Sequence, residues 1–81
     1  MAKSKVSFPI DWQAVGRRIR ELRGYDMNQA EMAMEVGIGQ SHLSAIERGK
    51  KEPSASVLHR IAMRYGKTIE WLLTGSDPQV R

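Results

Sequence analysis

Apolar residues recur at intervals of three and four along most of the chain, which is the spacing of one face of an α-helix. The first stripe consists of Trp12, Val15, Ile19 and Leu22. Asp11 stands directly before it, where a carboxylate can accept hydrogen bonds from the first backbone N–H groups of a helix. Gly24 follows it, and glycine commonly ends a helix. The pattern therefore predicts a first helix that begins after Asp11 and ends near Arg23.

Two short helices with a tight connection are predicted next. Asn28 and Glu31 have the spacing of a capping box, so the second helix begins at Asn28 and ends at Gly37. A third short helix is expected over residues 40–48. The link between the two helices, residues 37–39, holds three residues, and two of them are glycine.

The last two predicted helices complete the fold. Pro53 and Ser54 open the fourth, Thr68 caps the fifth, and Gly75 ends it. The fourth helix turns one apolar face inward, made of Val57, Leu58, Ile61, Ala62 and Tyr65. No stretch alternates apolar and polar residues over a useful length, as a half-buried strand would. The predicted fold class is all-α, a compact domain of five helices.

The second and third helices, with their three-residue link, have the pattern of a helix-turn-helix. The later helix of such a motif is compact enough to enter the major groove of DNA. Short turns also occur in any small helical bundle, so the pattern alone leaves plain helix packing open.

The side chains of the third helix favour DNA binding. At about 100° per residue, Leu43 and Ile46 lie together on one side, and Glu47 lies towards that inner flank. The opposite side is small and polar, and consists of Gln40, Ser41, Ser44, Ala45 and Arg48. Glutamine and serine can read base edges through hydrogen bonds. The alternative interpretation is an ordinary solvated face.

Length, composition and charge narrow the function further. The chain has 81 residues, enough for one small domain, which we place at residues 9–75 between a flexible basic tail at 1–8 and a second tail at 76–81. The absence of cysteine excludes a disulfide scaffold, a thiolate metal site and a cysteine nucleophile. Thirteen Lys and Arg residues against nine Asp and Glu residues give a net charge of +4, which favours a polyanionic partner.

Several other functions are excluded or disfavoured. No apolar run approaches the roughly 18 residues of a membrane span, and residues 1–8 lack the apolar stretch of a signal peptide, so we expect a cytoplasmic protein with no membrane partner. His42 and His59 are far apart, and no catalytic or metal-binding motif is present. We therefore expect no metal, no cofactor and no enzyme activity. Lys3 and Lys5 are candidates for a basic arm in a DNA groove, although an unfolded end is the simpler interpretation.

Six short motifs follow one another across about three quarters of the chain. They are Ile19-Arg20-Glu21-Leu22-Arg23, Asn28-Gln29-Ala30-Glu31-Met32-Ala33, Val36-Gly37-Ile38, Ile46-Glu47-Arg48-Gly49-Lys50, Pro53, and Glu70-Trp71-Leu72-Leu73-Thr74-Gly75. In this order and spacing, the stretch from Val15 to Gly75 resembles the lambda-repressor-like, Cro-type helix-turn-helix family of transcriptional regulators. The resemblance implies a DNA-binding domain whose third helix is the recognition helix.

The resemblance also assigns roles to individual residues. The expected base-reading residues are Gln40, Ser41, Ser44 and Ala45. The residues expected at phosphates or flanking positions are Asn28, Gln29, His42, Arg48, Lys50 and Lys51. Gln29 also stands at a helix start, where backbone N–H groups attract anions. Arg23 is expected to pair with Glu47 across the helix-turn-helix as a structural pair.

The chain departs from the family pattern in the link from Arg23 to Gln29, which is one residue shorter than usual, and at Gly39, Ala45 and Lys67, the last of which replaces an apolar residue before the fifth-helix cap. Gly39 stands where a serine or threonine commonly caps the third helix, and glycine is tolerated there. Ala45 can offer a base only a methyl group, which suits the methyl of thymine.

These observations together predict a sequence-specific DNA-binding transcriptional regulator, a repressor-like homodimer that reads a pseudo-palindromic operator through the major groove of double-stranded DNA. In the family, the fifth helix often forms the dimer contact, which points to Trp71 and Leu72. The alternative for both residues is the core of a single chain. The weak groove chemistry of Ser41, Ser44 and Ala45 leaves a second function open, an antitoxin-like or anti-repressor module that binds a protein partner such as a toxin.

Overall fold

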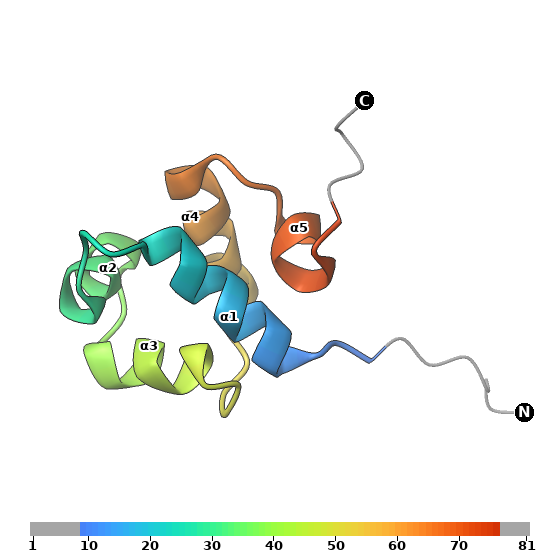
Figure 1. The fold of residues 1–81 in the computed structure, drawn as a ribbon, viewed down its shortest axis with the longest axis horizontal. Helices are drawn as coiled ribbons and strands as arrows, with labels where there is room; N and C mark the ends of the chain where they lie inside the picture. The colour runs from blue at the N-terminus through green and yellow to red at the C-terminus, as the bar shows by residue number, and fades with distance from the viewer. Residues whose placement is uncertain (1–8, 77–81) are drawn as a thin grey trace, which may run out of the picture.

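Five α-helices make up the fold in the computed structural model, which describes residues 9–76 (Figure 1). The helices are α1 (Trp12–Arg23), α2 (Gln29–Val36), α3 (Gln40–Glu47), α4 (Ala55–Tyr65) and α5 (Ile69–Thr74). No strand occurs in the described range, and the predicted all-α class is confirmed. None of these helices is long and apolar enough to cross a membrane. The predicted tail at residues 1–8, with Lys3 and Lys5, lies outside the described residues, as do residues 77–81 of the second tail.

The helices begin where the cap residues predict. The side chains of Asp11, Asn28, Ser54 and Thr68 each accept a hydrogen bond from a backbone N–H in the first turn of the following helix. The predicted bounds differ by one residue at both ends of α2, where Asn28 and Gly37 are the caps, and at the end of α3, which is Glu47 and not Arg48. The N–H of Gly49 donates to the carbonyl of Ile46 at 3.0 Å, a tighter turn that closes α3 one residue early.

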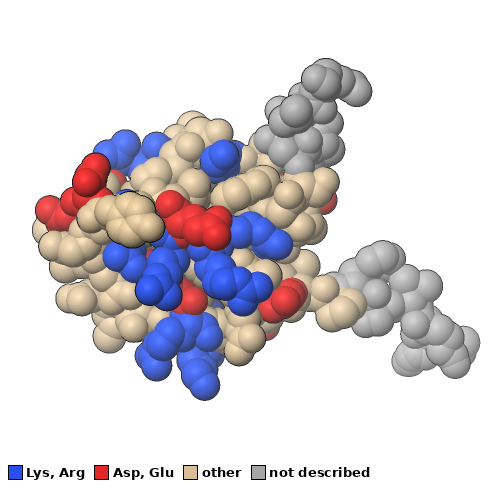
Figure 2. All heavy atoms as spheres, in the orientation of Figure 1, with Lys and Arg blue, Asp and Glu red and all other residues tan. Residues whose placement is uncertain are grey.

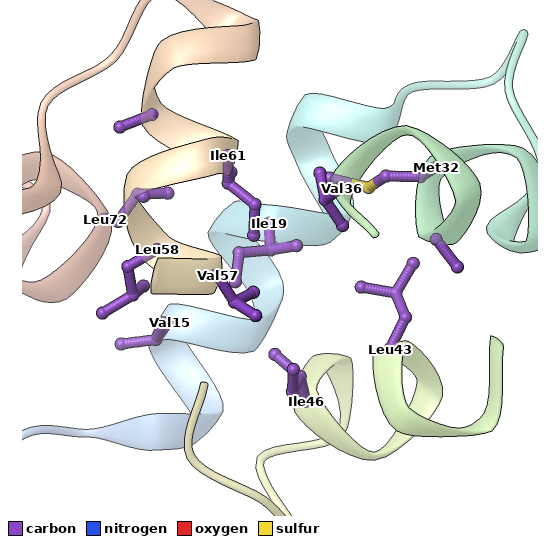
Figure 3. Close-up of a cluster of buried hydrophobic side chains, with 12 residues drawn as sticks. Val15, Ile19, Met32, Val36, Leu43, Ile46, Val57, Leu58, Ile61 and Leu72 are labelled. Atoms are coloured by element: carbon purple, nitrogen blue, oxygen red, sulfur yellow. The ribbon is translucent and has the colours of Figure 1, made fainter. Parts of the chain in front are cut away.

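One hydrophobic core joins all five helices. Its buried members are Val15, Ile19, Met32, Ala33, Val36, Leu43, Ile46, Val57, Leu58, Ile61, Ala62 and Leu72. Figure 3 shows Leu43 and Ile46 of α3 pointing away from their own helix, towards side chains of α1, α2 and α4. Since α3 is fastened to the core through this one side, its opposite side remains on the surface.

The contact between α1 and α3 is made by backbone. A Cβ atom on Gly16 of α1 would lie only 2.5 Å from the carbonyl oxygen of Ile46, and closer still to that of Glu47. The loop after α3 also meets the backbone of α1, because a Cβ on Gly49 would lie 2.8 Å from Cα of Gln13. The end of α3 and the following loop are therefore seated directly against the first half of α1.

Polar contacts hold α2 and α5 to the other helices. The hydroxyl of Tyr65 in α4 donates to Oε1 of Glu35 in α2 at 3.2 Å. Burial raises the pKa of this hydroxyl, and the nearby Glu35 carboxylate raises it further. On the other side, Nη1 of Arg18 in α1 donates to the carbonyl of Leu72 in α5 at 2.9 Å.

The close approach at Gly16 predicts the effect of a single methyl group. We expect Gly16→Ala to destabilise the protein by about 1–3 kcal/mol, because the new Cβ meets backbone carbonyls that cannot rotate away. Gly39→Ser is the matched control, since nothing lies within 4 Å of a Cβ at Gly39 and its backbone suits any residue. Urea unfolding should show a change of a few tenths of a kcal/mol for that control, towards higher stability. A Gly16→Ala protein as stable as the wild type would contradict this packing.

Candidate nucleic-acid interface

The turn between α2 and α3 follows from its two glycines. α2 ends at Gly37, whose φ of +77° is left-handed and favours glycine over residues with a Cβ. The N–H of Ile38 then donates to the carbonyl of Ala33 at 2.9 Å, which satisfies the end of α2. Gly39 is extended and precedes α3 without a side-chain cap. The chain thus enters α3 directly after α2, in the predicted helix-turn-helix order.

The outward side of α3 consists of the residues that the sequence places there. Gln40, Ser41 and Arg48 are exposed, while His42, Ser44 and Ala45 are partly exposed. Nε of Arg48 donates to the carbonyl of Ser44 at 3.3 Å, which holds this side chain along its own helix. The surface therefore carries hydroxyl, amide and guanidinium groups and no carboxylate.

The acidic residue of α3, Glu47, is turned inward and buried. Nε of Arg23 donates to its Oε2 at 3.0 Å, and Nη2 of Arg23 donates to its Oε1 at 2.8 Å. The side chains of Arg23 and Glu47 are only 17% and 4% exposed. Hydrogen bonding to this carboxylate raises the pKa of the Arg23 guanidinium, against the effect of burial. The predicted pair between α1 and α3 is present, with both carboxylate oxygens engaged.

A third helix contributes to the same carboxylate. Nε2 of Gln29, the first residue of α2, donates to Oε1 of Glu47 at 3.0 Å. This bond was not predicted, because it joins two side chains 18 positions apart whose distance depends on the helix-turn-helix geometry. Glu47 therefore ties α3 to α1 and to the start of α2 at once.

The start of α2 retains backbone donors for an anion. Asn28 and Glu31 form a reciprocal capping box, at 2.8 and 2.9 Å, which takes up the oxygen of the Asn28 side chain and the N–H of Glu31. The N–H groups of Gln29 and Ala30 have no partner inside the helix, because they belong to its first turn. These two N–H groups are thus available to an anion at this helix end, whereas the Asn28 and Gln29 side chains already have partners.

The two lysines lie beyond the end of α3. The N–H of Lys50 donates to the carbonyl of Ala45 at 2.9 Å, which folds the loop back on α3. The side chains of Lys50 and Lys51 are exposed. Figure 2 shows Lys and Arg side chains gathered over α1 and below it, at the end of α3. A basic surface thus borders the outward side of α3.

The two residues expected at a dimer contact differ in their surroundings. Leu72 is 0% exposed and belongs to the core of the single chain, so it has no surface to offer a second copy, and its assignment to an interface is corrected. The six-residue α5 lies over α1 and α4 and uses Leu72 to close the core between them. Trp71 is partly exposed, and Nζ of Lys67 lies 4.7 Å from the centroid of its ring.

Comparisons with known proteins agree with this geometry. A helix-turn-helix family model matches residues 17–72. An uncharacterised HTH-type transcriptional regulator of Archaeoglobus fulgidus is 36% identical over 64 residues, which cover 78% of this chain and 91% of that relative. The chain belongs to the helix-turn-helix family of transcriptional regulators. The family relation also confirms the expectation of a protein that is not an enzyme.

Other proteins similar to this helix-turn-helix regulator include repressors and a controller protein. The transcriptional repressor RstR of the cryptic phage CTXphi, from Vibrio cholerae, is 33% identical over 64 residues, 78% of this chain and 58% of the repressor. The solved structure of the P22 c2 repressor in complex with a synthetic operator has a TM-score of 0.72 at 29% identity, covering 79% of this chain and 98% of that one. The restriction-modification controller protein C.AhdI of Aeromonas hydrophila has a TM-score of 0.69 at 26% identity, covering 78% and 97%.

The buried pair of this regulator predicts an asymmetric response to mutation. Arg23→Ala should cost about 3–5 kcal/mol, because it leaves the Glu47 carboxylate buried without its cation. The double variant Arg23→Met with Glu47→Leu should cost far less, since no charge then remains in the site. Thermal and urea unfolding followed by circular dichroism measure both losses.

A second ion pair of the same type supplies the control. Arg64 and Glu35 are 3.1 Å apart with side chains 53% and 29% exposed, so Arg64→Ala should cost at most about 1 kcal/mol. If Arg23→Ala lowers the free energy of unfolding no more than Arg64→Ala does, the prediction that the buried Arg23–Glu47 pair stabilises the fold is contradicted.

Proposed function

We propose that this regulator binds double-stranded DNA in a sequence-specific manner, with α3 in the major groove. The observation that carries the proposal is the division of charge on α3. Its outward side presents amide, hydroxyl and guanidinium groups, while Glu47 is withdrawn into the contact with Arg23. A carboxylate on the outward side would be repelled by DNA phosphates, so its removal suits a polyanionic partner.

The base-reading residues are proposed from their positions along α3. Gln40 and Ser41 occupy the first turn and are exposed, which suits them to base edges at the floor of the groove. A glutamine amide can pair bidentately with adenine, and a serine hydroxyl can donate or accept. Ser44 and Ala45 lie one turn later, where the methyl of Ala45 fits a thymine methyl.

Phosphate contacts are proposed on both sides of α3. At the start of α2 they come from the first-turn N–H groups of Gln29 and Ala30, while the Gln29 side chain stays on Glu47. At the other end they come from Lys50 and Lys51, with Arg48 and His42 in flanking positions. The operator complex of the P22 c2 repressor, a protein of similar fold, supports DNA as the partner.

A homodimer on a pseudo-palindromic operator completes the proposal. One recognition helix reads only a few base pairs, and helix-turn-helix proteins commonly double their contacts on a two-fold-symmetric site. We assign Trp71 of α5 to the contact between the two copies. Trp71 is partly exposed, whereas Leu72 is buried. A repressor-like role is supported by the similarity to RstR.

Two substitutions separate base reading from phosphate binding. Gln40→Ala should cost about 1–3 kcal/mol on the operator and relax the preference at one base position. Lys50→Ala should weaken binding to all sequences alike and lower the slope of log affinity against log salt by about one. Equal losses on every sequence for both variants would contradict these roles.

The operator itself can be found by selecting genomic DNA fragments with the purified protein at about 150 mM salt and sequencing them. We expect a two-fold-symmetric motif whose half-sites are about 34 Å, one helical turn, apart. Featureless enrichment would contradict sequence-specific binding, and a single unpaired half-site would contradict the dimer.

A further inference from the structure

A basic flank of α1 lies beside α3 and has no role in the contacts described above. Gly16 and Arg23 mark the side of α1 that faces α3, because the first meets its last carbonyls and the second bonds its carboxylate. At about 100° per residue, Arg20 lies about 40° round from Gly16 and about 60° from Arg23. Arg20 thus stands at the edge of the contact with α3, on the surface.

Arg20 is free to bind a partner. Its side chain is exposed and makes no ion pair or hydrogen bond with any residue from 9 to 76. Arg18 and Arg23 on the same helix are bonded to Leu72 and Glu47. An exposed guanidinium without a protein partner retains all five of its N–H donors for an incoming anion.

The position of Arg20 connects the two proposed phosphate sites. On one side, it lines a hollow of about 910 Å³ together with Arg23 and with Asn28, at the start of α2. On the other side, the first turn of α1 holds the loop that carries Lys50, through the contact of Gly49 with Gln13. Figure 2 shows Lys and Arg side chains over α1 and at the end of α3 on one face, with acidic side chains among them.

Acidic neighbours limit the extent of this surface. Glu21, Asp26 and Glu31 line the same hollow, and Glu31 is already engaged with the backbone of Asn28. Arg17 lies about 60° further round than Arg20 and four residues before Glu21, whose charge opposes its own. The proposal therefore rests on Arg20.

We propose that Arg20 binds a phosphate of the DNA backbone between the phosphates held by the start of α2 and by the Lys50 loop. This inference rests on the proposed DNA binding and adds α1 as a third element of the interface. A guanidinium at this position matches a phosphate through two parallel N–H donors.

The test is the salt dependence of binding to the selected operator by wild type, R20Q, R20K and R60Q. R20Q should lower the slope of log affinity against log salt by about 0.9 per bound protomer. When the salt is raised from 50 to 200 mM, the operator affinity of R20Q should therefore fall by a factor about 3.5 times smaller, per bound protomer, than the factor for wild type. R20K keeps the charge and should keep the wild-type slope.

R60Q is the matched control. Arg60 lies on α4, which passes behind α1 in Figure 1, and among residues 9–76 its side chain bonds only Ser56 of the same helix. A wild-type slope for R60Q with a reduced slope for R20Q supports the proposal. An unchanged slope for R20Q overturns it, and so does an equal fall for R60Q or R20K. The melting temperature of R20Q should equal that of wild type, because the Arg20 side chain has no bonded partner among the described residues.

The two proposals fail in different ways. If the wild type shows no salt-dependent binding to any duplex, DNA binding itself is contradicted. If the wild type binds its operator and R20Q keeps the full slope, only the role of Arg20 is contradicted.

Discussion

The buried carboxylate of Glu47 is the group on which the arrangement of the candidate interface depends. A carboxylate taken out of water costs several kcal/mol unless charges and hydrogen bonds replace its hydration. Arg23 of α1 and Gln29 of α2 supply that replacement at 2.8–3.0 Å. Leu43 and Ile46 hold α3 to the core through contacts that have no preferred direction. The hydrogen bonds to Glu47 are directional, so they select one orientation of α3.

The same carboxylate links the two kinds of contact that a helix-turn-helix makes with DNA. Because Gln29 stands at the start of α2, its bond to Glu47 sets the distance between the backbone donors of α2 and the outward side of α3. Phosphate contacts fix the register of a protein on the duplex, and side chains in the groove read the bases in that register. The buried Glu47 carboxylate thus fixes the start of α2 relative to the outward side of α3.

The sequence predicted the helices well because their signals are local. The caps at Asp11 and Ser54 lie within three residues of the N–H groups they accept from, so they can be found without any knowledge of the fold. The Arg23–Glu47 pair came from the family resemblance. The Gln29–Glu47 bond was missed, and the burial of Leu72 was only the alternative interpretation, since both depend on distances between helices that periodicity does not supply. In a helix as short as α5, periodicity also separates core from surface poorly.

The most direct test of the role given to Glu47 is the ratio of operator affinity to non-specific DNA affinity in the double variant Arg23→Met with Glu47→Leu. This protein keeps an apolar contact in place of the buried ions, so its fold should persist while the directional bonds are lost. The account predicts that non-specific binding survives and that the ratio falls by about tenfold or more. A folded double variant with the wild-type ratio would show that packing alone orients α3, and would contradict the account.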